Sequence, residues 1–97
     1  MADVVVGRAA AEDLADLMRT YSLPPDTPER VARVLARLAS FPEMGQRLAG
    51  RWEGTRYLVG PWPWMLVVYE HHPELDRVDV LTIQDARSST AATSGGR

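Results

Sequence analysis

The spacing of apolar residues predicts that the first part of the chain is helical. Between residues 9 and 21, apolar side chains recur at intervals of three and four positions, which places them on one face of a helix. These side chains are Leu14, Leu17, Met18 and Tyr21. A short strand is expected before the helix, at residues 4–6, where three valines stand together.

A second helix is predicted after two consecutive prolines, since neither proline can continue the first helix. Asp26 or Thr27 can cap the new helix, and with Asp26 as the cap, Glu29 completes the spacing of a capping box. An apolar stripe follows, and Pro42 ends the pattern. The stripe consists of Val31, Val34, Leu35 and Leu38. The short connection between the two helices predicts an antiparallel hairpin.

From residue 55 the apolar pattern changes to that of β-strands. Residues 55–59 alternate, residues 64–70 are apolar almost throughout, and residues 78–84 are rich in β-branched side chains. The intervening GPWP sequence predicts a turn. The element order is therefore β-α-α-β-β-β, which predicts an α+β fold with a helical hairpin packed on one face of a small antiparallel β-sheet.

Chain length and tail composition predict one domain, spanning residues 1–88. Residues 89–97 are small and polar and cannot bury enough apolar surface to order themselves, so a flexible C-terminal tail is expected. No apolar run approaches the roughly 20 residues that a membrane span needs. We therefore expect a soluble cytoplasmic protein with no membrane contact.

The charge distribution limits the kinds of partner. The net charge of −2 argues against strong non-specific binding to nucleic acid. All positive side chains are arginines, because the chain contains no lysine. Residues 44–60 contain three of these arginines and fewer acidic residues, so a local basic patch is predicted there. The arginines are Arg47, Arg51 and Arg56, and Glu53 lies between them in the sequence. The absence of cysteine excludes disulfides and thiolate chemistry.

Four segments together resemble a known family. They read ADLMRTY, PERVARVLARLASFPEMGQRL, TRYLVGPWPWMLVVYE and DRVDVLTIQDARSS, and the resemblance covers roughly residues 10–88. In this order they resemble the RelE/ParE family of toxins from type II toxin–antitoxin systems. The resemblance implies a bacterial growth inhibitor, of the kind associated with plasmid stabilisation. It also implies a cognate antitoxin that wraps and neutralises the toxin in a hetero-oligomer.

The resemblance leaves the mechanism open between two modes. RelE-like members cleave messenger RNA on the ribosome, whereas ParE-like members poison DNA gyrase. RelE-like ribonucleases use lysines and arginines on the sheet and often a tyrosine near the C-terminus. Of that set only Arg56 and Arg87 have a match here, and Trp64-Met65 stands where the family commonly has an aromatic–arginine pair. This departure favours the ParE-like, protein-binding mode; a non-toxic family member that only binds a partner is a further alternative.

Candidate site residues follow from these alternatives. If the protein is a nuclease, Arg56 and Arg87 would stabilise the phosphate and Asp85 would act as the base. If it binds a target or an antitoxin, aromatic and arginine side chains are the expected contacts. That set comprises Trp52, Trp62, Arg51, Arg56 and Arg87.

No cofactor and no metal site are predicted. His71 and His72 are expected in a polar turn beside Pro73, and adjacent side chains of an extended segment point in opposite directions. Asp85 is also expected to pair with an arginine or to cap a turn. Tyr69 and Trp64 are expected in the core.

Overall fold

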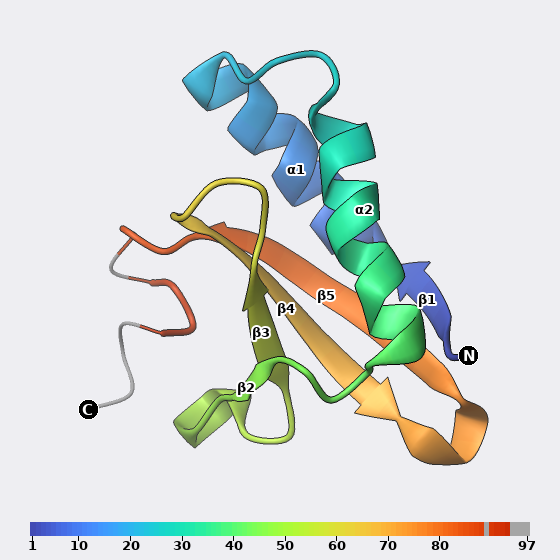
Figure 1. Ribbon diagram of the computed structural model, residues 1–97. Coiled ribbons are helices and arrows are strands. Elements are labelled where there is room, and N and C mark those ends of the chain that lie inside the picture. Colours follow the sequence, from blue (N-terminus) through green and yellow to red (C-terminus); the bar gives the residue numbers. More distant parts are fainter. Residues whose placement is uncertain (89, 94–97) are drawn as a thin grey trace.

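The computed structural model of the protein describes residues 1–88 and 90–93. Two helices and five strands form the fold (Figure 1). In chain order they are β1 (Asp3–Val6), α1 (Arg8–Tyr21), α2 (Thr27–Ser40), β2 (Gln46–Arg47), β3 (Arg56–Val59), β4 (Met65–His72) and β5 (Arg77–Asp85), with single 3₁₀ turns at Gly50–Trp52 and Pro73–Leu75. The predicted order of helices and long strands is confirmed, and β2 is an additional strand of two residues.

The sheet is mixed, with the spatial order β1-β5-β4-β3-β2. Strands β3, β4 and β5 pair antiparallel, as predicted, and the additional β2 pairs antiparallel with β3, but β1 pairs parallel to β5. The prediction of a wholly antiparallel sheet was therefore wrong at this edge. The reason lies in the connection, because the whole helical hairpin and the β2–β4 segment separate the two strands, and such a long crossover permits parallel pairing.

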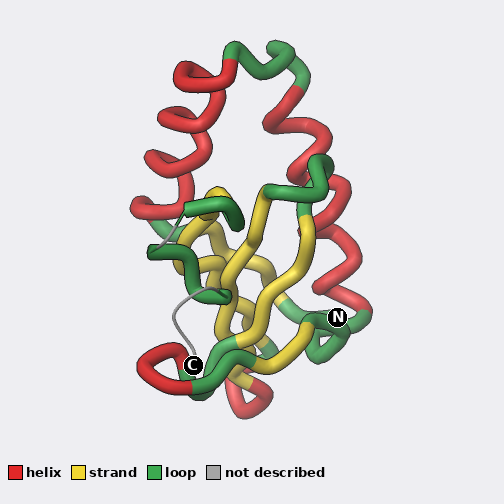
Figure 2. Tube along the Cα trace, turned by 90° about the vertical axis from the view of Figure 1, so that its left-hand side faces the viewer, coloured by secondary structure: helices red, strands yellow, loops and turns green. Residues whose placement is uncertain are grey.

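The helices form a separate layer on one side of the sheet, and Figures 1 and 2 both show them joined at the end far from the N-terminus. The predicted stripe of α2 faces the core, with Val31, Leu35 and Leu38 buried. It packs against the alternate positions of β4 that include Val67 and Tyr69. The intervening residues Leu66 and Val68 are buried as well, so the first five residues of β4 are covered on both faces of the sheet.

Asp13 links α1 to β5. Its carboxylate oxygen Oδ2 accepts hydrogen bonds from the hydroxyl of Thr82, at 2.5 Å, and from the backbone N–H of Ile83, at 3.1 Å. The parallel pairing of β1 with β5 ends at Val80, so the Ile83 N–H lies beyond the last partner that β1 offers. The side chain from α1 therefore satisfies a strand donor that would otherwise lack a protein partner.

Two local predictions were wrong. Asp26 precedes α2 but makes no capping hydrogen bond; its carboxylate instead pairs with Arg30 at 3.0 Å, one helical turn further on. His71 and His72 are not in a turn, because β4 continues through them. Their place in the ladder opposite β5 supplies the backbone hydrogen bonds that keep them extended.

The described part of the predicted tail folds back onto the end of the sheet. Ala91 and Ala92 are buried, and the backbone N–H of Ala92 donates to the side-chain oxygen of Gln84 at 2.7 Å. Residues 89 and 94–97 lie outside the described residues, so the flexibility predicted for them stays a prediction. Among the described residues, no helix has both the length and the apolar character that crossing a membrane requires.

Candidate functional site

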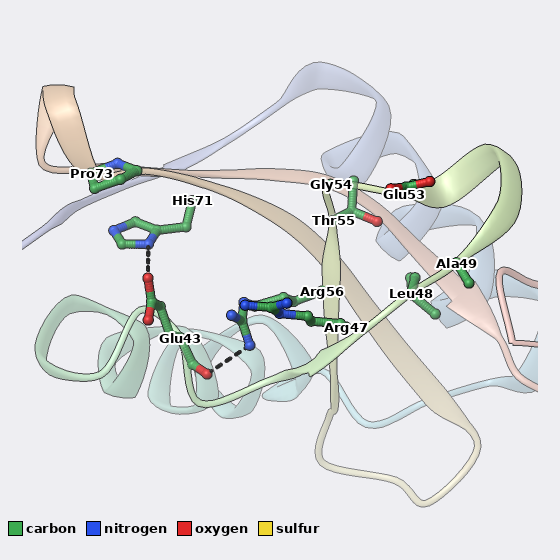
Figure 3. Close-up of a pocket in the computed structure, with 10 residues that line it drawn as sticks. All are labelled: Glu43, Arg47, Leu48, Ala49, Glu53, Gly54, Thr55, Arg56, His71 and Pro73. Atoms are coloured by element: carbon green, nitrogen blue, oxygen red, sulfur yellow. Dashed lines mark hydrogen bonds and ion pairs between the residues drawn. The ribbon is translucent and has the colours of Figure 1, made fainter.

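A cavity of about 670 Å³ lies between β3, the end of β4 and the loop that follows α2 (Figure 3). We call it the Arg56 pocket. Its polar side chains are Glu43, Arg47, Glu53, Thr55, Arg56 and His71. The predicted basic patch thus contributes two of its three arginines to a concave surface, together with two glutamates and a histidine.

The loop after α2 is held in place by Arg56 and Tyr69. One nitrogen of the Arg56 guanidinium, Nη1, donates to the backbone oxygens of Glu43 and Gly45, at 3.0 and 2.9 Å. The buried hydroxyl of Tyr69 accepts a hydrogen bond from the Gly45 N–H at 2.9 Å. Burial raises the pKa of Tyr69, which keeps this phenol neutral. Arg56 is therefore anchored by backbone carbonyls, rather than by the carboxylate partner that a surface arginine usually finds.

Arg47 and Arg56 oppose each other directly in the β2–β3 ladder, so their side chains leave the same face of the sheet. Neither forms an ion pair within residues 1–88 and 90–93. Like charges facing each other across two strands are unfavourable unless something compensates them. The pair is therefore suited to an anionic ligand, which both guanidinium groups would contact.

His71 and Glu43 form the second feature of the pocket. The imidazole Nδ1 of His71 lies 3.3 Å from a carboxylate oxygen of Glu43, and Figure 3 shows this pair beside Arg56. His71 is in phase with Tyr69 on β4, so its side chain projects to the helix-covered face, near the C-terminal end of the strand. A histidine oriented by a carboxylate is a common arrangement for proton transfer. The pocket thus combines anion-binding groups with an acid–base pair.

A second polar site lies at the opposite end of the β4–β5 ladder. There the guanidinium of Arg87 lies 4.7 Å from the ring centroid of Trp64 and 5.0 Å from that of Tyr21. It also pairs with Asp85 at 2.8 Å, and the Tyr21 hydroxyl donates to the same carboxylate at 2.5 Å. Hydrogen bonds from Arg87 lower the pKa of Asp85 far below its usual range. We call this group, with Trp62, the C-terminal cluster.

The predicted nuclease residues do not form one site. Arg56 lies opposite Tyr69 of β4, whereas Asp85 lies opposite Met65, four residues away along the same strand. That separation is about 13 Å along the strand. Asp85 and Arg87 are together, as the alternative of an acid–arginine pair predicted. Because Arg87 depresses its pKa, Asp85 is a weak base.

The remaining predicted contact residues are dispersed. Trp62 stacks on Trp64 at 6.3 Å between ring centroids, and the guanidinium of Arg30 lies 5.7 Å from its ring. Trp52 is half-buried in the 3₁₀ turn before β3, and Arg51 lies 5.9 Å from its ring. Tyr69 is in the core as predicted, whereas Trp64 is only partly buried and packs against the edge of the core.

His71 and Glu43 were missed as functional candidates, and Arg47 was predicted only as part of the basic patch. The sequence held a signal for His71, because it continues the alternation of Met65, Val67 and Tyr69 if β4 is extended by two residues. Glu43 and Arg47 reach the pocket only through the loop after α2, and their spacing along the chain does not indicate this. One group of histidine and acidic side chains with metal-ligand spacing occurs in the described residues, on the other face of β4 and β5.

Comparison with solved structures identifies the fold. A copper-bound mutant toxin from Helicobacter pylori superposes with a TM-score of 0.67 at 18% identity, covering 88% of this chain and 94% of that one. YafQ from E. coli superposes with a TM-score of 0.63 at 11% identity, covering 94% of this chain and 100% of YafQ. The RelBE2 toxin–antitoxin complex from Mycobacterium tuberculosis gives 0.52 at 20% identity, covering 87% and 90%.

This chain has the RelE-type toxin fold. The resemblance predicted from the sequence is therefore confirmed at the level of the fold, which extends over nearly the whole chain. No protein-family model and no curated protein sequence matches it. Since one fold supports several activities, its function has to be argued from the pocket and the surface.

Proposed function

We propose that this protein is the toxin component of a type II toxin–antitoxin pair and that a cognate antitoxin neutralises it. The proposal is supported by the RelE-type fold over nearly the full chain, including the likeness to a chain of the RelBE2 toxin–antitoxin complex. A toxin of this size inhibits growth by acting on one essential target, either by cleaving RNA or by binding a protein.

Cleavage of RNA is the mode that the geometry of the Arg56 pocket favours. The sequence-based preference for the ParE-like mode rested on missing nuclease residues, and the pocket supplies a different set. Arg47 and Arg56 would hold the phosphate, and the facing pair of positive charges is the observation that carries this proposal. The size of the cavity, about 670 Å³, is adequate for a nucleotide.

The Glu43–His71 pair would perform the proton transfers. The Glu43 carboxylate would take the proton of the ribose 2′-hydroxyl as its oxygen attacks the adjacent phosphorus. The protonated imidazole of His71 would give a proton to the departing 5′-oxygen, leaving a cyclic phosphate and a 5′-hydroxyl. The arginines would stabilise the negative charge that develops on the phosphate oxygens.

Binding to DNA gyrase, without nuclease activity, is the second candidate mode. It is favoured by the C-terminal cluster, where Trp62, Trp64 and Arg87 share one surface. Tryptophan and arginine are the residues most enriched at energetically important positions of protein interfaces.

Induced expression in a bacterial host separates these modes. The RNase proposal predicts growth arrest with cleaved transcripts, relief by co-expression of a cognate antitoxin, to be sought in the neighbouring open reading frame, and loss of arrest in His71→Ala. Cell filamentation and DNA-damage signalling with intact transcripts would instead support the gyrase-directed mode. Growth unaffected by folded, wild-type protein would refute the toxin proposal and leave a partner-binding protein.

A further inference from the structure

The face of the sheet opposite the helices carries a compact group of ionisable side chains near the β4–β5 connection. Glu70 and His72 alternate with the buried Tyr69 along β4, so they project from the face that the helices do not cover. Asp79 lies directly opposite Glu70 in the antiparallel ladder. Two carboxylates and an imidazole therefore meet on one side of the hairpin, facing away from the Arg56 pocket.

The distances within this group match those between ligands of one metal ion. Nε2 of His72 lies 2.9 Å from Oε1 of Glu70 and 3.3 Å from Oδ2 of Asp79. The three ligand atoms all lie within 4.8 Å of one another. Metal–ligand bonds of about 2.1 Å place two ligands ~3.0 Å apart at a right angle and ~3.4 Å apart at a tetrahedral angle. The side chains therefore need little movement to surround an ion.

We propose that Glu70, His72 and Asp79 bind a divalent transition-metal ion, with Zn²⁺ as the ion that best fits the donors. One imidazole nitrogen with two carboxylate oxygens is a donor set that zinc accepts. Magnesium and calcium, in contrast, prefer oxygen ligands alone. The proposal replaces the sequence-based expectation of no metal site, which rested on the wrong placement of His72 in a turn.

The surrounding residues orient the ligands. Arg77 holds the Asp79 carboxylate, with its Nε 3.0 Å from Oδ1 and its Nη2 donating to Oδ2 at 3.2 Å. A carboxylate that accepts such bonds keeps lone pairs for a metal, and ligands of this kind are commonly supported by a second partner. Oε1 of Glu74 lies 3.6 Å from Nδ1 of His72, on the side of the imidazole ring away from the two proposed carboxylate ligands.

The charges of the group also favour a cation. Glu70, Glu74 and Asp79 carry three negative charges against the single positive charge of Arg77, which leaves −2 when His72 is neutral. A divalent ion would neutralise this remainder. The ligand side chains of Glu70, His72 and Asp79 are 40%, 26% and 25% exposed, so an ion can enter and complete its coordination with water.

Calorimetric titration of the wild-type chain with Zn²⁺ tests the site. We expect one ion per chain and a rise in the melting temperature that a chelator reverses, because the ion would join β4 to β5. His72→Gln and Asp79→Asn should weaken binding by more than about tenfold. His71→Gln is the matched control, since it removes the adjacent imidazole from the opposite face and should leave zinc affinity unchanged.

Three results would overturn the site: no saturable binding by the wild-type protein, undiminished affinity in His72→Gln, or an equal loss in His71→Gln. If a variant fails to fold, nitrogen NMR of the wild-type imidazoles still decides the question. Zinc should shift the Nε2 resonance of His72 far more than either nitrogen of His71, and equal or absent shifts would contradict the proposal. The site stands independently of the toxin function, because zinc binding is measured without RNA or antitoxin.

Discussion

The guanidinium of Arg87 donates hydrogen bonds to both carboxylate oxygens of Asp85, at 2.8 and 3.0 Å, just beyond the last strand. The same carboxylate accepts the Tyr21 hydroxyl from the end of α1. The polar end of β5 is thus a connection between the helical layer and the sheet. Asp85 and Arg87 neutralise each other at this end of the protein, whereas Arg47 and Arg56 in the Arg56 pocket have no carboxylate partner among the described residues.

Replacing Arg87 by alanine should lower stability near neutral pH and reduce the acid sensitivity of the protein. Arg87 holds the pKa of Asp85 below its ordinary value of 3.8, so the pair stabilises the native state above that pH. This contribution is lost as the pH falls through the lower, native pKa. Urea unfolding of wild type and Arg87→Ala should therefore differ more near pH 7 than near about pH 2. Arg33 is an exposed arginine on α2, so the Arg33→Ala control should show no such pH-dependent difference. If wild type and Arg87→Ala differed equally in unfolding free energy at both pH values, the proposed effect of Arg87 on Asp85 would be contradicted.

Gly45 should not tolerate a side chain. An added Cβ would lie 2.6 Å from the backbone oxygen of Tyr57 and 2.7 Å from the hydroxyl of Tyr69. Both neighbours are held by the sheet and the core, so Gly45→Ala should cost about 1–3 kcal/mol through overpacking. Chemical denaturation measures this loss. Gly50→Asn is the control, because that position has open space and a left-handed backbone that asparagine accepts, and comparable destabilisation there would count against the steric explanation.

Asp13 should matter more for stability than its neighbour Glu12. Removing the Asp13 carboxylate leaves the Ile83 N–H and the Thr82 hydroxyl without their acceptor, which should cost about 1–3 kcal/mol. Thermal and urea unfolding of Asp13→Ala and Glu12→Ala provide the comparison. Glu12 is exposed on the same helix and should have a small effect. If the two variants proved equally stable, the link between α1 and β5 would contribute little.

The patterns that predicted the fold were those that depend on burial. The stripe at Val31, Leu35 and Leu38 and the apolar run of β4 each require one buried face, and they identified their elements correctly. The parallel placement of β1 was not predictable in the same way, because a short strand of valines suits either direction. The predicted cap at Asp26 is also absent, because the Asp26 carboxylate pairs with Arg30 and not with the backbone N–H groups of the helix.

The candidate pocket was harder to predict than the fold. Arg56 was recognised from its strand, but its role as an anchor for the loop depends on carbonyl groups of Glu43 and Gly45, which carry no side-chain signal. His71 was misplaced because Pro73 suggested an early turn, whereas the strand ends only at His72. Local sequence thus predicted individual residues, while their convergence depended on tertiary packing.

Arg47→Ala should lower RNA cleavage without lowering the stability of the protein. Removing one of two facing arginines relieves charge repulsion, so the variant should be as stable as wild type or more stable by about 0.2–0.5 kcal/mol. The same change removes a phosphate contact and should lower RNA cleavage by at least about tenfold, measured on free RNA and on ribosome-bound messenger RNA. Arg51→Ala is the matched control, because it removes the same charge from the same basic stretch but does not line the pocket. A loss of cleavage in Arg51→Ala as large as in Arg47→Ala would point to general electrostatic attraction. Unchanged cleavage in Arg47→Ala would exclude the facing arginines as the phosphate site.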